Sequence, residues 1–337
     1  MQPTEAQRIS PPRTWESDSD HFLQVIESPW YRALVDVQNA LTTATCGFYS
    51  LRGYPAMQFP VTTCSISSPM GLGSDSLPVK INLFGVETYL ADSMQFMLEY
   101  GCRLTKSGCY YLMPSFRGEH ADKTHLCQFY HSEAEIVGGL EDVIGLVESY
   151  VRHLCQEVLR INSETILRTA GTLQHIEQLL KPSALPRVTV DEACALLQND
   201  AALVQHHSLG FRTIRRQGER ALTEHYGGAV WLTHMDHLSV PFYQAFAPDK
   251  SKALAADLLL EGVEVVGSGE RHCSAEQVRE ALRVHNVDPA PYEWYIRLKD
   301  RYPYQTAGFG LGVERFICWL LRHDDVRDCQ ILPRFNG

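Results

Sequence analysis

Residues 308–321 read GFGLGVERFICWLL and join a glycine-rich strand to an apolar helix. Gly308, Gly310 and Gly312 stand two residues apart, and glycines in this pattern permit close approach of a ligand to the backbone. Arg315, at the start of the following helix, can meet a phosphate directly. The spacing differs from the dinucleotide-binding fingerprint, whose third glycine comes one residue later. Taken alone, the segment fits a phosphate site and a tight glycine turn equally well.

A second segment, residues 116–136, reads FRGEHADKTHLCQFYHSEAEI. Arg117 and Glu119 precede a polar loop, and Phe129 follows it with two further carboxylates, the first of them Glu133. Flanking strands would carry Arg117 and Phe129 to opposite sides of one pocket, where a planar cation suits a phosphate and a ring suits a base. When this segment is taken alone, a surface hairpin with solvated charges is the better explanation.

A third segment, residues 257–271, reads DLLLEGVEVVGSGER and spaces Asp257, Glu264 and Arg271 seven residues apart. Two carboxylates on strand-like sequence can hold Mg²⁺ against phosphate oxygens, because hard cations take oxygen ligands. Exposed charges at a sheet edge explain the pattern equally well when it is taken alone.

The composition is that of a globular protein, with 337 residues of which 45% are hydrophobic. The formal net charge of -10 gives no general attraction to a polyanion, so nucleic acid is not the expected partner. The first residues lack a signal-peptide pattern, and no apolar run is long enough to cross a membrane. The 10 cysteines form no CxxC pair and suit reduced core residues. A cytoplasmic protein without membrane contact is therefore expected.

The chain divides into a tail and one large domain. Residues 1–27 are polar with two adjacent prolines and predict a disordered or loosely docked tail. Residues 28–337 form the expected domain, and within it residues 162–230 are predicted to be a helical insertion. A break is expected inside the insertion at LKPSALPR, where two prolines bracket a short loop.

Hydrophobic periodicity predicts the elements of this domain. Helices are expected at 28–45, 91–102 and 139–161, and strands at 57–63, 79–84, 109–116, 125–136, 229–234, 240–246 and 263–270. The strands are not joined by short βαβ units, which favours an α+β fold with an antiparallel sheet flanked by helices.

The three segments together resemble the class II aminoacyl-tRNA synthetases, and among these most closely the asparaginyl enzymes. FRGE with HLCQF is similar to motif 2 of that family, GFGLGVER is similar to motif 3, and the helix and strand ending at Pro60 stand where motif 1 belongs. The resemblance runs collinearly from Ser28 to the terminal ILPR and extends to the archaeal asparagine synthetase-like paralogues. It implies the class II catalytic core, with a six- or seven-stranded antiparallel sheet, and a homodimer formed through motif 1.

The resemblance also implies a site for ATP and Mg²⁺. Arg117 would grip the α-phosphate, Phe129 and Arg315 would sandwich the adenine, and Arg315 would also meet the γ-phosphate. Asp257 and Glu264 match the metal-binding pair. No protein nucleophile is needed, because such a site works by positioning substrates and neutralising charge. The implied catalytic residues are Arg117 and Arg315, and the implied ATP-binding residues are Arg117, Glu119, His125, Phe129, Glu264, Gly312 and Arg315.

The same resemblance implies an amino-acid site. Gln95 and Glu133 would hold the ammonium group, while Glu99 and Arg271 would face the side chain. Aspartyl enzymes carry a lysine at the position of Leu98. Glu99 would accept a hydrogen bond from the asparagine amide and would repel aspartate. Asparagine is the preferred substrate, with aspartate and analogues of either as alternatives.

The tRNA-binding parts of the family pattern are altered. Asparaginyl enzymes carry an N-terminal OB-fold of roughly a hundred residues that reads the anticodon, and residues 1–27 cannot form one. The loop from Glu119 to His125 is one residue shorter than in the family, and Thr124 replaces the arginine that precedes the histidine. This loop meets the tRNA acceptor end in the family, so tRNA binding is not expected.

The substrate side also departs from the family pattern. MGLGSD, residues 70–75, replaces the Glu-Gly-Ala stretch that caps the amino acid, and Gln305 and Thr306 replace the Pro-His before motif 3. The leading hypothesis is therefore a free-standing ligase that activates asparagine, aspartate or an analogue with ATP and transfers it to an unknown acceptor other than tRNA. The alternatives are an asparagine synthetase that uses aspartyl-adenylate and ammonia, a minimal asparagine–tRNA ligase, and a non-catalytic binding paralogue.

Overall fold

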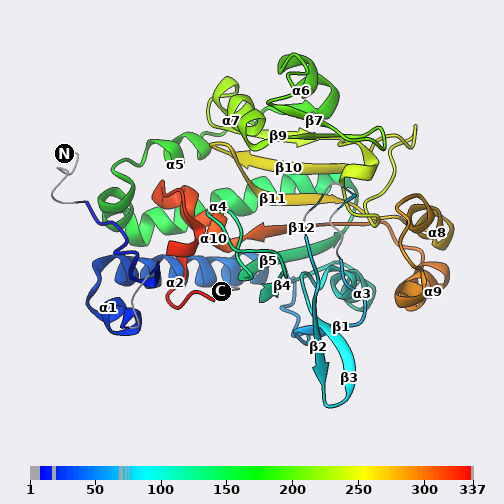
Figure 1. The fold of residues 1–337 in the computed structure, drawn as a ribbon, viewed down its shortest axis with the longest axis horizontal. Helices are drawn as coiled ribbons and strands as arrows, with labels where there is room; N and C mark the ends of the chain where they lie inside the picture. The colour runs from blue at the N-terminus through cyan, green and yellow to red at the C-terminus, as the bar shows by residue number, and fades with distance from the viewer. Residues whose placement is uncertain (1–7, 17–19, 68–70, 73, 75, 335–337) are drawn as a thin grey trace.

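The computed structural model describes residues 8–16, 20–67, 71, 72, 74 and 76–334 and has a seven-stranded sheet at its centre (Figure 1). Neighbouring strands are antiparallel, except that β6 runs parallel to β9. The prediction of an antiparallel sheet flanked by helices is confirmed. In sheet order the strands are β4 (Gly108–Phe116), β5 (Gln128–Val137), β12 (Thr306–Gly312), β11 (Val263–Glu270), β10 (Ala255–Leu260), β9 (Ala229–Thr233) and β6 (Arg187–Thr189).

One face of the sheet is covered by helices (Figure 1). Because side chains alternate between the two faces of a strand, Leu258 of β10 and Phe309 of β12 point into the core beneath these helices. Proline at the first helical position pre-sets the start of α2, and Leu34 and Val37 of that helix are buried. The covering helices are α2 (Pro29–Ser50), α4 (Leu140–Ala170) and α10 (Val313–Leu321).

Helix α4 is longer than predicted, since it ends at Ala170 and not at residue 161. Asn162 leaves the helical dihedral angles, with φ -127° and ψ 19°, and marks a kink. The helix nevertheless continues, because Ile166 beyond the kink is fully buried against the core. Gly171 follows as the C-cap residue, and its φ of 75° is a left-handed conformation that glycine adopts easily.

The other face of the sheet is only partly covered. Helix α3 packs on it against β4 and β5, and Phe96 of α3 contacts Tyr292 and Tyr295 edge to face. A small sheet with the order β1-β3-β2 extends outward beside α3 (Figure 1). The elements on this side of the sheet are α3 (Gln95–Thr105), β1 (Thr62–Thr63), β2 (Val79–Leu83), β3 (Val86–Leu90), η3 (His237–Ser239), α8 (Ala275–Val284), η4 (Ala290–Tyr292) and α9 (Glu293–Arg301). Among the described residues, no helix combines the length and apolarity that a membrane span requires.

The segment 162–230, predicted as a helical insertion, contains the end of α4 and three further helices but also short strands. It begins inside α4, and it contains three strands, of which β6 belongs to the central sheet. The strands RVT, VQH and RTI are too short to show an alternating pattern, which explains why the sequence hides them. The elements after α4 are α5 (Gln174–Leu179), β6, α6 (Val190–Leu196), β7 (Val204–His206), β8 (Arg212–Ile214) and α7 (Arg216–His225).

The prediction of a disordered or loosely docked tail at 1–27 is wrong for residues 8–16 and 20–27, which pack on the rest of the chain. Trp15 Nε1 donates to Asp328 Oδ1 over 2.8 Å, and Arg13 Nε donates to Asp328 Oδ2 over 3.1 Å. Arg13 and Trp15, which make these contacts, stand among polar residues in the sequence, so composition alone does not reveal the docking of this segment. The elements involved are η2 (Thr14–Glu16), α1 (His21–Glu27) and, at the other end of the chain, η5 (Val326–Cys329).

Two predicted strands also differ. Residues 240–246 form no strand, and only isolated bridges such as Gln244 to Arg271 tie them to the sheet. In the segment 57–63 only Thr62 and Thr63 pair as a strand. Prolines at Pro60 and Pro241 remove a backbone donor in each segment, which limits regular pairing.

Three buried histidines form a cluster beneath α8. His285 Nε2 lies 3.0 Å from His237 Nδ1, and His272 Nε2 lies 3.2 Å from the Phe242 carbonyl oxygen. Burial lowers the pKa of His237 to about 4 and the pKa values of His272 and His285 to about 3. All three side chains are therefore neutral in the folded protein near pH 7.

The free energy of unfolding is expected to fall as the pH drops below about 6.5. An unfolded histidine takes up a proton there, whereas these three stay neutral until the pH nears their lowered pKa values, so the unfolded state binds more protons. Each histidine then lowers the free energy of unfolding by up to about 1.4 kcal/mol per pH unit. Urea unfolding between about pH 7.5 and 5.5 measures the slope. His285→Gln should flatten it, and an unchanged slope would contradict the assignment.

Candidate active site

A cavity of about 380 Å³ opens on the sheet face opposite α2 and α4. Strands β5, β10, β11 and β12 form its base, and α3, the end of β4 and residues 239–244 form its walls. All predicted site residues except Glu99 line it. Those that do are Gln95, Arg117, Glu119, His125, Phe129, Glu133, Asp257, Glu264, Arg271, Gly312 and Arg315.

Glycines make the floor of the cavity. In the register of β11 and β12, Gly267 pairs with Gly310 and Gly269 pairs with Gly308. Gly267 and Gly310 line the cavity and leave a patch of backbone two strands wide, on which a ligand can rest. Gly269 and Gly308 are covered instead, because an added Cβ would overlap Gln244 Oε1 at the first and the Glu135 carboxylate at the second.

The guanidinium of Arg117 lies beside the ring of Phe129 and not across a pocket from it, which corrects the sequence-based expectation. Arg117 Cζ is 5.3 Å from the ring centre. The two residues sit on the same side because Arg117 follows β4 directly and its backbone N–H donates to the Cys127 carbonyl oxygen over 2.9 Å. Arg117 Nε is buried and has no acceptor in the part of the chain that the structure describes, and Nη1 is 3.9 Å from Glu119 Oε1. Most of its donors are available to an anion.

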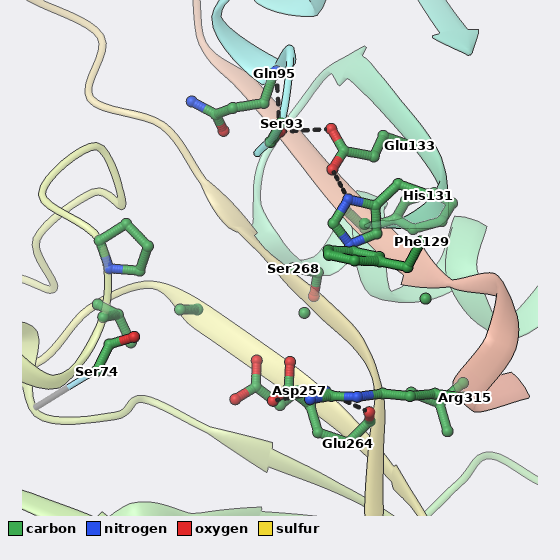
Figure 2. Close-up of a pocket in the computed structure, with 18 of the residues that line it drawn as sticks. Ser74, Ser93, Gln95, Phe129, His131, Glu133, Asp257, Glu264, Ser268 and Arg315 are labelled. Atoms are coloured by element: carbon green, nitrogen blue, oxygen red, sulfur yellow. Dashed lines mark hydrogen bonds and ion pairs between the residues drawn. The ribbon is translucent and has the colours of Figure 1, made fainter. Parts of the chain in front are cut away.

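Arg315 faces Phe129 across the cavity (Figure 2). Because β12 ends at Gly312 and α10 begins one residue later, Arg315 projects from the first turn of the helix over the sheet edge. Its Nη1 donates to the Glu264 carbonyl oxygen over 3.1 Å, and its Nε donates to the Thr124 carbonyl oxygen over 3.4 Å. These main-chain anchors hold the guanidinium in place across the cavity from Phe129.

His125 lies at the rim of the cavity, in the loop between β4 and β5. Its Nδ1 is 3.1 Å from Asp122 Oδ1, and Asp122 also accepts from the backbone N–H groups of Thr124 and His125. These bonds close a compact turn. Thr124 turns its hydroxyl into this turn, where it donates to Asp122 over 2.9 Å.

Asp257 and Glu264 share one face of the sheet because of a bulge. The pairing of β10 with β11 shifts between Leu258 and Leu259, so one extra residue lies in β11. An added Cβ at Gly267 would meet Glu264 Oε1 at 3.3 Å and Asp257 Oδ1 at 3.6 Å, which places both carboxylates over the same glycine. Without the bulge, the alternation of side chains would send Glu264 to the opposite face.

This pair fits a divalent cation. Burial raises the pKa of Asp257 well above its usual value, and the charges of Glu264 and Glu219 raise it further. A cation would relieve this repulsion. Among the described residues, no cluster of three or more His, Cys, Asp or Glu side chains could hold a metal ion. Two carboxylates that leave the other coordination positions open suit Mg²⁺, because this cation keeps several waters and binds phosphate oxygens in addition to its protein ligands.

A second anionic centre lies at the other end of the cavity, around Glu133. Its Oε2 accepts from Ser93 Oγ over 2.7 Å and from Tyr111 OH, and its Oε1 lies 3.0 Å from His131 Nδ1 (Figure 2). Burial raises the pKa of Glu133, but His131 and the two hydroxyls outweigh burial and lower it overall. The carboxylate is therefore anionic. Gln95 Nε2, buried nearby, has no hydrogen-bond partner among the described residues and can bind a ligand.

Arg271 and Glu135 form a buried ion pair beside that centre. Arg271 Nε and Nη2 each lie 3.1 Å from a Glu135 carboxylate oxygen, and Nη1 donates to Gln244 Oε1 over 2.8 Å. Burial raises the pKa of Glu135, but Arg271 opposes this effect, and its two hydrogen bonds hold the carboxylate as an anion. An acceptor and a donor thus stand side by side at this end of the cavity.

Glu99 does not face the cavity, and the prediction that it contacts the substrate side chain is wrong. It is fully buried behind α3, where its carboxylate pairs with Lys299 and accepts from Tyr295 OH over 2.8 Å. Its neighbour Leu98 lines the cavity instead. Successive residues on a helix point about 100° apart, so only one of these two can face the ligand.

Sequence reasoning gave no role to His131, Glu135, Tyr243 and Gln244, although all four line the cavity. A period of two along β5 places Phe129, His131, Glu133 and Glu135 on one face, and this signal was present in the sequence. Tyr243 and Gln244 come from an irregular segment, so no periodicity could have found them.

The departures at 70–75 and 305–306 differ in position. Residues 70, 73 and 75 lie outside the described residues, and of the rest Ser74 lines the cavity. Gln305 lies away from the cavity, where its Nε2 donates to Glu270 Oε1 over 2.8 Å. Thr306 is fully buried in β12.

Residues 18–336 match the model of a family described as tRNA synthetases class II (D, K and N). The chain belongs to the class II tRNA synthetases. The asparagine–tRNA ligase of Pyrococcus abyssi is 28% identical over 317 residues, which are 92% of this chain and 70% of that protein. The asparagine–tRNA ligase of Pyrococcus furiosus is 31% identical over 263 residues, which are 76% of this chain and 58% of that protein.

Solved structures agree with this assignment. The asparaginyl-tRNA synthetase of Pyrococcus horikoshii, complexed with asparaginyl-adenylate, is similar at a TM-score of 0.85 and 27% identity, over 97% of this chain and 75% of that chain. The expected class II synthetase fold and the closeness to asparaginyl enzymes are confirmed, as is the enzyme class, a ligase of the aminoacyl-tRNA synthetase type.

Proposed function

We propose that this class II synthetase activates asparagine, or a close relative of it, as an aminoacyl-adenylate and passes it to an acceptor other than tRNA. One observation carries the proposal. A single cavity holds Arg117, Arg315 and a carboxylate pair at one end, and Glu133 with the Glu135–Arg271 pair at the other. The first end suits a nucleoside triphosphate, and the second suits an amino acid.

The proposed chemistry needs no protein nucleophile. An oxygen of the amino-acid carboxylate attacks the α-phosphorus of ATP, the bond from that phosphorus to the bridging oxygen breaks, and pyrophosphate leaves. Glu133 holds the ammonium group, and the glycine floor lets the two substrates lie in line. Arg117, with its unpaired donors, neutralises charge on the α-phosphate as the new bond forms. Phe129 and Arg315 hold the adenine between them.

Mg²⁺, when bound, neutralises charge on the phosphates and on the departing pyrophosphate. Asp257 and Glu264 are the residues proposed to hold it. Arg315 shares this end of the cavity and lies 3.7 Å from Glu264 Oε2, so the carboxylate pair also positions the arginine.

We assign the choice between asparagine and aspartate to Glu135 and Arg271, because both line the cavity and Glu99 does not. Glu135 can accept from an amide NH₂ while Arg271 donates to the amide oxygen, and the anion opposes a second carboxylate. This supports asparagine over aspartate. It also speaks against the synthetase alternative, in which ammonia attacks an aspartyl-adenylate.

The nature of the acceptor is a separate proposal. The net charge of -10 gives no general attraction to tRNA, and Thr124, bonded to Asp122, stands where the family carries an arginine. A second candidate is a minimal asparagine–tRNA ligase, which is favoured by the names of the relatives in Pyrococcus. We also propose a homodimer, for which Phe22, Ile26 and Val35 on α1 and α2 offer exposed apolar surface.

Exchange of labelled pyrophosphate into ATP, measured over a panel of amino acids without tRNA, tests the proposal. Exchange that depends on asparagine or a close relative is expected. Silence across the panel would overturn adenylate formation in the absence of tRNA. Incubation with total tRNA then separates the two candidates, because stable asparaginyl-tRNA would establish the second and rule out the first.

A further inference from the structure

The side chain of Gln330 joins the two walls of the cavity at the end proposed to hold adenine. Its Nε2 donates to the Gln128 carbonyl oxygen over 2.7 Å and to Glu314 Oε1 over 2.9 Å. Gln128 is the residue before Phe129 on β5, and Glu314 stands before Arg315 on α10. Carbonyl and carboxylate oxygens accept hydrogen bonds, so the amide nitrogen, and not the amide oxygen, must face them. One side chain thus ties the strand of Phe129 to the helix of Arg315.

Glu314 is a fixed partner for this amide. It is 4% exposed, and its two carboxylate oxygens accept from the backbone N–H of Tyr130 over 3.2 and 3.0 Å. Burial raises the pKa of Glu314, and the hydrogen bond from Gln330 opposes this effect. Removal of the amide would leave a buried carboxylate oxygen without this bond, which weakens the link between α10 and β5.

The segment that carries Gln330 is itself held from two sides. In η5, just before it, the Val326 backbone N–H donates to the Lys123 carbonyl oxygen over 2.9 Å, in the loop between β4 and β5. On its other side, Asp328 accepts from Trp15 Nε1 of the docked N-terminal segment over 2.8 Å. A side chain on a backbone fixed in this way can set a distance between two other elements.

The distance between Phe129 and Arg315 decides how well a flat ring binds between them. The two side chains face each other across the cavity (Figure 2). Dispersion attraction falls steeply with separation, and a gap that widens by about 1 Å loses about half of it. Gln330 is half-buried and does not line the cavity, so it acts on a ligand through these two residues and not by contact.

We propose that Gln330 is a positioning residue for the adenine ring, which sets the gap between Phe129 and Arg315 by tying β5 to α10. The inference rests on the proposed function, in which these two residues hold the adenine between them. Gln330 affects the affinity for the base more than the affinity for the phosphates. The other proposed phosphate contacts, Arg117 and the carboxylate pair, come from the end of β4 and from β10 and β11.

Two matched variants test this proposal, Gln330→Lys and Gln330→Met. Both side chains are long and unbranched, but only lysine offers donors to Gln128 and Glu314. Titration calorimetry measures the affinities for α,β-methylene-ATP and for inorganic triphosphate, each with Mg²⁺. The methionine variant should lower the ratio of nucleotide affinity to triphosphate affinity about tenfold. The lysine variant should keep this ratio within about threefold of the wild type. Because both ligands carry three phosphates, the ratio is insensitive to the charge of the lysine.

A further control is Gln178→Met, at a glutamine away from the cavity. Gln178 Nε2 donates to the Gly227 carbonyl oxygen over 2.9 Å, and the loss of this bond should change neither affinity. If Gln330→Met does not fold, Gln330→Ala, which needs no apolar packing, takes its place. An equal fall of both affinities, or an unchanged ratio, would overturn the proposal, because a purely structural role weakens both ligands alike.

Pyrophosphate exchange is measured separately on the wild type. Exchange with asparagine, together with an unchanged ratio in the methionine variant, would remove the inference and keep the proposed function. A lowered ratio without exchange in the wild type would do the reverse. A wild type that binds the nucleotide no more tightly than the triphosphate gains nothing from the base, and this result would also overturn the inference.

Discussion

Arg315→Ala is expected to lower asparagine-dependent pyrophosphate exchange by about a thousandfold or more, with the fold intact. The guanidinium lies over the cavity opposite Phe129. In the proposed mechanism it holds the adenine, and the family resemblance implies that it also meets the γ-phosphate. Arginines that neutralise phosphate charge in a transition state contribute about 10³–10⁵ in rate. Its own contacts are two main-chain carbonyl oxygens and the exposed edge of Glu264, so the core loses little.

Arg117→Ala should have an effect of the same size, because its unpaired donors are those proposed for the α-phosphate. Arg160→Ala is the matched control, since Arg160 is exposed on α4 and pairs only with Glu157 on its own helix. Exchange assays with circular dichroism as a check on folding make the comparison. Normal exchange in either cavity variant would remove that arginine from the site.

Gly308→Ala is expected to lower the free energy of unfolding by about 3 kcal/mol, the upper range for overpacking a rigid interior. An added Cβ would lie 2.6 Å from the Ala134 carbonyl oxygen of the paired strand and would overlap the Glu135 carboxylate. Arg271 holds that carboxylate in place, and the backbone of β5 is locked in the sheet, so neither can yield easily. Either the pairing register of β12 with β5 must shift, or the buried ion pair between Glu135 and Arg271 must break.

Gly310→Ala is the matched control on the same face of β12. The three atoms nearest to its Cβ would all belong to the Glu133 side chain, the closest of them at 3.1 Å. We expect it to cost less than about 1 kcal/mol of stability and to impair substrate binding more than folding. The free energies of unfolding of both variants, measured by urea unfolding, test this expectation. Equal stabilities would mean that β12 can shift and that the floor is not rigid.

Much of the fold was accessible from periodicity. The apolar repeat from Ser28 predicted α2, and the alternation in residues 125–136 predicted β5. Elements of three residues, such as β6, are too short to carry a period, and their pairing depends on neighbours far along the chain. The docking of residues 8–16 was hidden for the same reason, since its anchors lie near the other end of the sequence.

The sequence by itself determined which chemical groups are present and in what order. The alternate glycines, Arg117, Arg315 and the carboxylates of 257–271 were all recognisable, because backbone clearance and phosphate affinity belong to single residues and short spacings. Only the tertiary structure decided which charged residues lie next to each other. A bulge of one residue brings Glu264 to the face of Asp257, and Lys299, 200 positions away, takes Glu99 out of the cavity. Ion pairing depends on distance in space, and chain separation carries no information about it.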